Sequence, residues 1–396
     1  METAPPAPEP PHPSPEVAPD PPEDLAGRVR EAHRQASRVL ARSSTAEPLA
    51  RALSRTAAEA APRYDLDHTH PDLYGNGLVA ELEERTARVL GKEAALFFPT
   101  GTMAQQIALR CWAQRLDNPL VALHPLAHPV VHEDEALTQL AGLRLTHPTR
   151  EPRPPTPREV AELPEPFGTL MLELPLRDAG FLLPDWDELV ATVEAARERE
   201  AVVHFDGARL WECARHFGRS LPEIADLADS VYVSFYKSLG GLSGAALAGP
   251  ATLVEEARVW RHRYGGLPFQ QWPAALSALN GLEHRLPRLP SFVDQARRVA
   301  DALDEGLRAA EVPWWRLQPR VPHTHQFHLW LPHESEHLMT ATATQAEETG
   351  VALFRAWDEP GLPPGLSFTE VTVTEPGLTW TPEEVTEALR EFLRRV

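Results

Sequence analysis

Two stretches decide the fold of this chain, AVVHFDGARLW at residues 201–211 and SVYVSFYKSLGGLSGAALAG at residues 230–249. Each begins with a short apolar run bounded by polar or turn residues, which is typical of a strand buried on both faces of a sheet. Asp206 ends the first run, and Lys237 ends the second run 31 residues later. Because ligands bind beyond the carboxyl ends of the strands in open α/β sheets, we expect Asp206 and Lys237 to converge on one site.

The chain around these stretches alternates between strand patterns and helix patterns. Short apolar runs are followed or preceded by amphipathic segments, at 78–90 (helix), 94–98 (strand), 102–114 (helix), 169–174 (strand) and 186–199 (helix). This alternation predicts an α/β domain with a mostly parallel sheet and right-handed crossovers. The proline-rich stretch Arg144–Pro166 is predicted to be a long surface connection.

Composition divides the chain into four segments. Residues 1–23 are rich in proline and are predicted to be a disordered tail. Residues 24–63 show two amphipathic helical patterns, which we expect to pack on the body or on a partner subunit. Residues 64–272 form the predicted large domain. Residues 273–396 form a predicted smaller α+β domain.

Charge and cysteine content exclude several classes of function. The net charge of −19 disfavours binding to nucleic acid or to an anionic membrane. No apolar run is long enough for a membrane helix, and the first residues do not resemble a secretory signal. The two cysteines, Cys111 and Cys213, lack the spacing of a disulfide scaffold or a thiolate zinc site, so we expect a cytoplasmic protein.

Lysine is rare in this chain, which makes Lys237 conspicuous. Of 38 basic side chains only Lys92 and Lys237 are lysine, and only a lysine amine can act as a nucleophile. Pyridoxal phosphate requires a lysine that forms a Schiff base with it and a carboxylate that keeps its ring nitrogen protonated. Lys237 and Asp206 fit this pair. The alternative is structural, with the lysine capping the sheet and the aspartate capping a turn.

A third segment provides an anion site upstream of this pair. In FFPTGTMAQQIALR, residues 97–110, an apolar run meets Thr100, Gly101 and Thr102 before a helical pattern resumes. Backbone amides, a hydroxyl and the helix dipole at such a turn favour a phosphate group. The order of phosphate turn, aspartate and lysine is the order that a pyridoxal phosphate enzyme needs.

The ordered motifs resemble the threonine aldolase and aromatic amino acid beta-eliminating lyase family. They are DLYGNGLVAELEERTARVLGKEAALFFPTGTMAQQ (72–106), LAHPVVHEDE (126–135), LELPLRDAG (172–180) and the two stretches quoted above. The resemblance implies the aspartate-aminotransferase-like fold (fold type I) of pyridoxal phosphate enzymes. It also implies roles for individual residues: Lys237 in cofactor attachment and catalysis, Asp206 at the ring nitrogen, His128 stacked on the ring, Gly101 and Thr102 at the phosphate, Arg209 and Tyr74 at the substrate.

The chain departs from the family pattern mainly on the substrate side. We find no Arg-Ser-Asp-Thr segment ahead of Tyr74, and the Glu-Asn-Thr-His stretch is replaced by Glu173-Leu174-Pro175-Leu176. The phosphate-side arginine of the family is replaced by Phe269, so Arg261 or Arg263 would have to supply that charge; Arg263 is our candidate. Cofactor machinery is therefore kept while substrate machinery is altered.

The resemblance places His132 beside the substrate side chain, and we expect it to take a proton from the substrate hydroxyl. An unperturbed histidine, with a pKa of about 6.5, suits that step near neutral pH. The alternative is that His132 only stacks or hydrogen-bonds near Glu133. Although His124, His128 and His132 are spaced by four, intervening prolines interrupt a helix, so no metal site is predicted.

These patterns predict a lyase that depends on pyridoxal phosphate. The favoured reaction is retro-aldol cleavage of a β-hydroxy-α-amino acid to glycine and an aldehyde. One alternative is β-elimination, or other chemistry at Cα, on a different amino acid. An alternative from another class is a protein that binds pyridoxal phosphate without turnover. We expect a homodimer or homotetramer with shared active sites.

Overall fold

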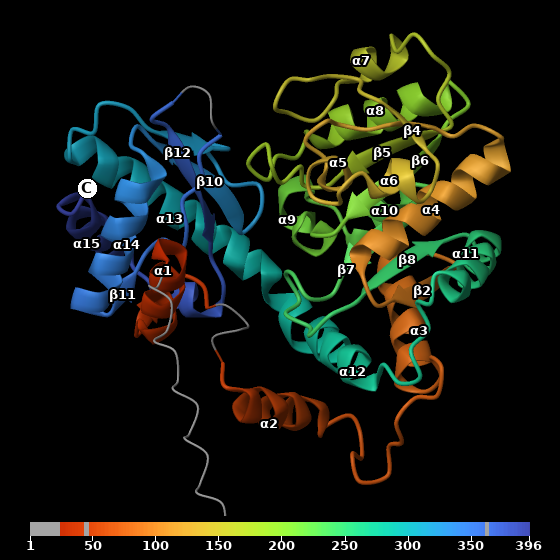
Figure 1. The fold of residues 1–396 in the computed structure, drawn as a ribbon, viewed down its shortest axis with the longest axis horizontal. Coiled ribbons are helices and arrows are strands. Elements are labelled where there is room, and N and C mark those ends of the chain that lie inside the picture. The colour runs from red at the N-terminus through yellow and green to blue at the C-terminus, as the bar shows by residue number, and fades with distance from the viewer. Residues whose placement is uncertain (1–23, 43–46, 361–363) are drawn as a thin grey trace, which may run out of the picture.

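The computed structural model describes residues 24–42, 47–360 and 364–396, so the predicted tail at 1–23 lies outside the described residues (Figure 1). The helices are α1 (Leu25–Gln35), α2 (Leu49–Ala60), α3 (Leu78–Leu90), α4 (Gly101–Leu116), α5 (His128–Val131), α6 (Ala136–Gln139), α7 (Pro157–Ala161), α8 (Trp186–Arg197), α9 (Ala214–Phe217), α10 (Leu221–Asp226), α11 (Ala251–Arg263), α12 (Trp272–Asn280), α13 (Leu289–Ala309), α14 (Ser335–Thr349) and α15 (Pro382–Leu393). A short 3₁₀ turn, η2 (Leu210–Glu212), follows Arg209.

The largest sheet has seven strands in the order β2-β8-β7-β6-β5-β3-β4. They are β2 (Ala94–Phe98), β3 (Leu120–Ala122), β4 (Arg144–Thr146), β5 (Thr169–Glu173), β6 (Val202–Gly207), β7 (Ser230–Ser234) and β8 (Ala245–Gly249). Strands β4, β3, β5, β6 and β7 pair in parallel, and β8 runs antiparallel to both of its neighbours. The predicted α/β fold with a mostly parallel sheet is confirmed.

Helices cover both faces of this sheet, which explains why its central strands are mostly apolar. One face packs on α4 and α11, with Leu96, Ile107 and Leu247 in a single buried cluster. The other face packs on α3, α8 and α10, with Leu82 and Leu189 among its buried side chains. The sheet is therefore the middle layer of a three-layer unit (Figure 1).

The stretch Arg144–Pro166 is more than the surface connection that its prolines suggested. It contains the edge strand β4 and the helix α7. Thr156 and Glu159 form a capping box at the start of α7, and Pro157 occupies the first helical turn. Proline is tolerated there because the N–H groups of that turn have no partner within the helix. Proline content alone was therefore a misleading signal.

A second unit combines an antiparallel sheet with three helices. Its strands β9 (Arg316–Gln318), β10 (Gln326–Leu331) and β12 (Ser367–Thr372) lie in the order β12-β10-β9. Helices α13, α14 and α15 contribute to the hydrophobic cluster on this sheet. The long helix α13 runs from the large unit to this small unit (Figure 1).

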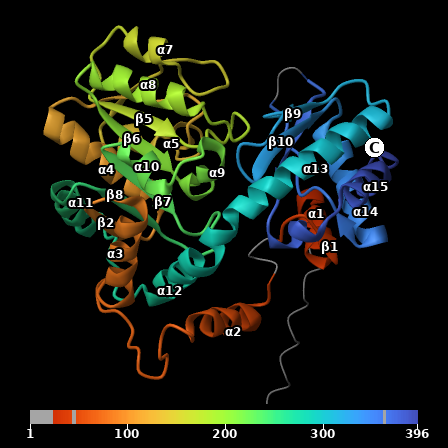
Figure 2. The same ribbon diagram turned by 180° about the vertical axis from the view of Figure 1, so that it is seen from behind.

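The beginning of the chain packs against its end. Helix α1 lies on α14, and the short strand β1 (Arg38–Val39) pairs in parallel with β11 (Val351–Ala352) (Figure 2). The side chain of Leu40 belongs to the hydrophobic cluster of the small unit. Helix α2 instead contacts α12, near the large unit.

The two hydrophobic clusters meet inside α13. Ala275 and Leu279 of α12 and Phe292 of α13 belong to the cluster of the large unit, whereas Ala296 begins that of the small unit. The packing thus changes about twenty residues after the predicted limit at 272/273, and the domain limits remain predictions. Among the described residues, no helix is long and apolar enough to cross a membrane.

Candidate active site

Three ionisable side chains meet at the carboxyl edge of the large sheet. Asp206 lies near the end of β6, and Lys237 follows the end of β7 by three residues. Glu173, the last residue of β5, stands opposite Asp206 in the parallel register. The charge of Lys237 affects the pKa of both carboxyl groups, and Asp206 affects that of Glu173, so the three lie within one electrostatic site. The convergence expected for Asp206 and Lys237 is therefore present in the structure.

Burial shifts the protonation of Lys237 and Asp206. The pKa of Lys237 is lowered to about 8, chiefly by burial and then by the nearby Arg209 guanidinium, against the opposing effect of Asp206. Burial raises the pKa of Asp206, and the charge of Lys237 counteracts this rise. A lysine with a lowered pKa has more of the neutral amine that a carbonyl carbon requires.

Glu173 is a site residue that the sequence patterns did not reveal. Its side chain accepts backbone N–H groups from His128, at 2.7 Å, and from Arg177, at 3.2 Å. Burial and the neighbouring Asp206 raise the pKa of Glu173 to about 8. The sequence could have indicated Glu173 only through its position at the end of a predicted strand, 169–174. In the sequence Glu173 stands out only as the first residue of a replaced motif.

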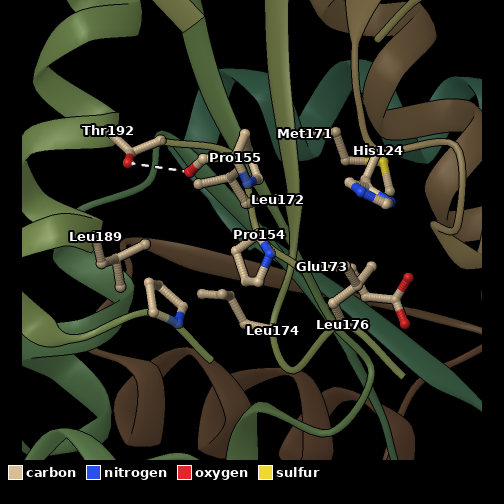
Figure 3. Close-up of a pocket in the computed structure, with 11 residues that line it drawn as sticks. His124, Pro154, Pro155, Met171, Leu172, Glu173, Leu174, Leu176, Leu189 and Thr192 are labelled. Atoms are coloured by element: carbon tan, nitrogen blue, oxygen red, sulfur yellow. Dashed lines mark hydrogen bonds between the residues drawn. The ribbon is translucent and has the colours of Figure 1, made fainter. Parts of the chain in front are cut away.

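A small internal cavity lies between β5 and α8. It has room for roughly one water molecule, and it is lined mostly by apolar residues of β5, α8 and the neighbouring loops, including Leu172, Pro155 and Leu189. Figure 3 shows the carboxylate of Glu173 on the opposite side of β5 from Leu189 and Thr192. This cavity is too small to hold a cofactor.

The predicted phosphate turn lies at the start of α4. Thr100 caps the helix by accepting the backbone N–H of Met103 at 3.3 Å, and Gly101 and Thr102 are its first residues. A Cβ atom at Gly101 would collide with the hydroxyl of Tyr232, so only glycine fits there. Free N–H groups in the first helical turn make this an anion site.

Two side chains of β7 complete a cradle beside this turn. The Tyr232 hydroxyl lies against Gly101, and Tyr232 stands opposite Asp206 in the sheet register. Ser234 Oγ is buried without a hydrogen-bond partner among the described residues. A buried hydroxyl is normally satisfied, so the residues present fit the phosphate of the cofactor. Neither hydroxyl was predicted, because both lie within an apolar run.

His128 and His132 lie side by side over this region, with ring centroids 5.1 Å apart. His128 Nδ1 is 3.3 Å from Glu133 Oε1, whose side chain is almost fully buried. His132 Nε2 is 2.7 Å from Asp178 Oδ2, and Arg177 Nη1 is 3.2 Å from the same ring nitrogen. The partner of His132 is therefore Asp178 rather than Glu133.

The expected substrate-side residues lie in different surroundings. Arg209 Nε donates to Gln326 Oε1 at 2.8 Å, and its guanidinium lies over the ring of Phe181. Tyr74 is exposed and packs edge-to-face on Phe269, with ring centroids 5.3 Å apart. Arg209 thus lies directly before η2, whereas Tyr74 lies on the surface of this chain.

The two arginines considered for the phosphate differ in environment. Arg261 is buried, with Nη1 3.2 Å from Glu83 Oε1 and 2.6 Å from the carbonyl oxygen of Phe97. The positive charge of Arg261 is therefore compensated by Glu83 within the protein. Arg263, at the end of α11, is exposed and stacks on Trp260. The cofactor role of Arg263 stays a prediction.

The remaining basic candidates lie outside the site. Lys92 Nζ donates to the carbonyl oxygen of Ala228 at 2.7 Å, and burial lowers its pKa. His124 Nε2 contacts the carbonyl oxygen of Glu151 at 2.7 Å, so its ring does not join those of His128 and His132. Among the described residues, no three His, Cys, Asp or Glu side chains are arranged to hold a metal ion.

The Arg-Ser-Asp-Thr segment of the family has a near match ahead of Tyr74. Residues 42–45 read Arg-Ser-Ser-Thr, which differs from that segment by one residue, so the chain carries a variant of the segment rather than the segment itself. Arg42 Nη2 donates to the carbonyl oxygen of Ala36 at 3.2 Å. Residues 43–46 lie outside the described residues, so the match is one of sequence alone.

Solved structures similar to this chain share its fold. A Listeria monocytogenes protein assigned as an L-allo-threonine aldolase superposes with a TM-score of 0.84 and 31% identity, over 94% of this chain and all of that chain. An Exiguobacterium protein assigned as an aromatic amino acid beta-eliminating lyase/threonine aldolase gives 0.83 and 32%, over 93% and 100%. The fold is therefore fold type I of the pyridoxal phosphate enzymes, as predicted.

Curated sequences and family models point to the same family. The low specificity L-threonine aldolase of Escherichia coli K12 is 30% identical over 59% of this chain and 72% of its own length. An uncharacterised Caenorhabditis elegans protein is 28% identical, and the match spans 58% of its length. The model of the beta-eliminating lyase family, whose members depend on pyridoxal phosphate, matches residues 70–313. The chain belongs to the beta-eliminating lyase family.

Proposed function

We propose that this protein is a pyridoxal phosphate-dependent lyase that cleaves the Cα–Cβ bond of a β-hydroxy-α-amino acid, releasing glycine and an aldehyde. The observation that carries the proposal is the meeting of Lys237 and Asp206 at the carboxyl ends of adjacent strands, next to the helix terminus at Gly101. Similarity to threonine aldolases favours this reaction among those open to such a site.

The residues of this chain divide the work between cofactor and substrate. When bound, pyridoxal phosphate supplies an electron sink for the electron pair of the broken bond. We assign cofactor binding to Lys237, Asp206, His128, the turn at Gly101 and Thr102, and Arg263. Asp206 keeps the ring nitrogen protonated, because a buried carboxylate stabilises a positive charge beside it.

On the substrate side, Arg209 binds the carboxylate, since its planar guanidinium matches that group. His132 takes the proton of the β-hydroxyl as the Cα–Cβ bond breaks. If Nε2–H donates to Asp178, Nδ1 remains as the proton acceptor. Lys237 then delivers a proton to Cα, which completes glycine. We further assign Tyr74 to substrate binding in the assembled oligomer.

A product assay tests the proposal and separates it from its alternatives. Purified protein supplied with pyridoxal phosphate is incubated with threonine, allo-threonine, phenylserine and serine, and the products are identified by mass spectrometry. Glycine plus an aldehyde supports the proposal. Ammonia plus a 2-oxo acid supports β-elimination, which we test because the chain matches the model of the beta-eliminating lyase family. Cofactor binding without any product supports the non-catalytic alternative.

We also propose a homodimer or homotetramer with shared active sites, located in the cytoplasm. Leu73, Tyr74 and Phe269 form an exposed apolar group beside the phosphate-turn side of the large unit, each with more than half of its surface accessible. Exposed apolar groups of this kind favour a protein contact. Light scattering of wild type and of Leu73→Glu tests this, with a monomeric wild type as the contradicting result. Cys111 and Cys213 are both buried and unpaired, as a reducing compartment permits.

A further inference from the structure

Two adjacent residues at the beginning of β10, His325 and Gln326, connect the small unit to the candidate active site. Gln326 Oε1 accepts Arg209 Nε at 2.8 Å, and Gln326 Nε2 donates to Thr372 Oγ1 of β12 at 3.1 Å. The amide is therefore fixed at both ends, its oxygen towards the guanidinium and its nitrogen towards β12. A buried amide held in this way restricts the orientation of the arginine that it contacts.

His325 makes the second connection through a buried ion pair. Its Nε2 is 2.6 Å from Glu212 Oε2, and its Nδ1 is 2.7 Å from the carbonyl oxygen of Val373. A carbonyl oxygen only accepts hydrogen bonds, so Nδ1 carries a proton, and Nε2 facing a carboxylate carries one as well. Both side chains are almost fully buried. The imidazolium and the carboxylate thus neutralise each other within the protein.

The environment of His325 favours its charged form. Burial lowers the pKa of His325, but Glu212 and the Val373 carbonyl outweigh that effect, so the net shift is upward. Arg209 opposes the charge, and the ring of Phe292 on α13 lies 6.0 Å from the imidazole ring. The ion pair is therefore intact below the raised pKa and is lost as the pH rises through it.

Glu212 extends this connection to the loop between β7 and β8, residues 235–244, which contains Lys237 and is called the Lys237 loop below. Its Oε1 accepts Ser238 Oγ at 3.1 Å, and Ser238 is the residue after Lys237. Glu212 also ends η2, the turn that begins directly after Arg209. Gln326 therefore contacts Arg209, which directly precedes η2. His325 acts through Glu212, the last residue of η2, on Ser238.

We propose that Gln326 and His325 are positioning residues: Gln326 orients Arg209 towards the substrate carboxylate, and the His325–Glu212 ion pair fixes Ser238 and the Lys237 loop. The proposal rests on the proposed function, because it uses the carboxylate-binding role of Arg209. It adds that the small unit sets the geometry of both groups. A movement of β10 would then change the positions of Arg209 and of Lys237 at the same time.

The first test measures glycine binding by spectral titration of the holoenzyme, in wild type, Gln326→Leu and Gln326→Glu. Glycine carries the carboxylate but no β-carbon, so its affinity reports on Arg209 whichever bond the enzyme cleaves. We expect Gln326→Leu to weaken glycine binding roughly 10-fold or more, the effect of losing a hydrogen bond to a charged group. Gln326→Glu keeps the accepting oxygen and should recover most of the affinity.

A matched control distinguishes positioning from general damage to the small unit. Gln295 is a buried glutamine of α13 whose Nε2 donates to the carbonyl oxygens of Gly377 and Trp380, both in the small unit. Gln295→Leu should lower thermal stability and leave the glycine affinity unchanged. Unchanged glycine affinity in Gln326→Leu, or an equal loss in Gln295→Leu, overturns the proposal for Gln326.

The second test compares the pH dependence of kcat/KM in wild type and in His325→Gln. Glutamine can donate to Glu212 at any pH, so the variant should lack the alkaline decline that deprotonation of His325 causes in wild type. Identical alkaline limbs overturn the role of His325. A wild type that binds glycine but cleaves no β-hydroxy amino acid contradicts the proposed function while leaving the Gln326 test valid. A wild type that does not bind glycine overturns both.

Discussion

Glu173 and Asp206 stand directly opposite each other on the neighbouring parallel strands β5 and β6. Both carboxyl groups are buried, and burial raises the pKa of each. Lys237 holds the pKa of Asp206 down, whereas Asp206 helps to raise that of Glu173 to about 8. The pKa of about 8 leaves Glu173 protonated at pH 7, and we expect the negative charge of the pair to lie on Asp206, whose pKa Lys237 lowers.

The first prediction follows from these protonation states and compares matched substitutions of Glu173 and Asp206. Glu173→Gln should retain turnover within about threefold of wild type at pH 7, because an amide resembles a protonated carboxyl group. Asp206→Asn should retain the cofactor and lose about 100-fold or more in kcat, since an amide cannot stabilise a protonated ring nitrogen. Steady-state kinetics with the best substrate measure both. Equal losses in the two variants would show that the charge is not confined to Asp206.

The second prediction concerns the lysine that holds the cofactor. Borohydride reduction of the holoenzyme should attach the cofactor to the peptide that contains Lys237, identified by mass spectrometry. Lys237→Ala should abolish this labelling, and Lys92→Arg, which changes the only other lysine, should leave it intact. Label on the Lys92 peptide would exclude the assignment.

The third prediction is a pH dependence of cofactor uptake by the apoprotein. The pKa of Lys237 is lowered to about 8, so its neutral amine is the minor form below that pH and the major form above it. The observed association rate should rise about tenfold per pH unit up to pH 8 and then level off. Stopped-flow absorbance follows the reaction. A rate that still climbs at pH 10 would indicate an unperturbed lysine.

The fourth prediction tests His132 as the base. His132→Phe keeps an aromatic ring beside His128 but removes the proton acceptor, so Cα–Cβ cleavage should fall about 10²- to 10⁴-fold, the range of general-base catalysis. Asp178→Asn, which keeps a hydrogen-bonding group near Nε2, should cause a smaller loss. Should cleavage in His132→Phe fall less than about tenfold, the role would pass to His128 or to a bound water.

The fifth prediction concerns the hydroxyl of Tyr232, which lies against Gly101. Tyr232→Phe should weaken the binding of pyridoxal phosphate roughly 10-fold or more and leave the binding of pyridoxal, which lacks the phosphate, unchanged. Tyr64→Phe, at a tyrosine whose hydroxyl donates to Glu81 Oε1 at 2.7 Å, is the matched control. Equal losses for both ligands in Tyr232→Phe would place the hydroxyl elsewhere than at the phosphate.

The sequence predicted the large sheet well because its strands are buried on both faces. Continuous apolar runs between helical patterns have few other interpretations, so β5 lies within one residue of its predicted bounds, and β6 and β7 begin within one residue of the two stretches quoted at the outset. The short strand β3, the edge strand β4 and the antiparallel β8 were not predicted. Strand β8, Ala245–Gly249, consists mostly of alanine and glycine, whose weak strand preference gives little signal.

The site was predictable only where a strand ends in a chemically distinctive residue. Asp206 and Lys237 follow apolar runs and stand out, and the phosphate turn is marked by Gly101. Tyr232 and Ser234 lie inside a strand and look like ordinary strand residues until the register shows what they face. The contacts of Arg209 with Gln326 and of His132 with Asp178 join residues distant in sequence, which no local pattern specifies.

The packing of α1 on α14 has a consequence for synthesis of the chain. The ribosome makes α1 first, yet α14 emerges about 300 residues later. Until then Val29, Ala32 and Ala36, which are buried against α14 in the finished protein, have no partner. Contacts between residues so distant form slowly, because a long loop must close before they are made. We therefore expect the large unit to fold during translation, and α1 to dock only after α14 has left the ribosome.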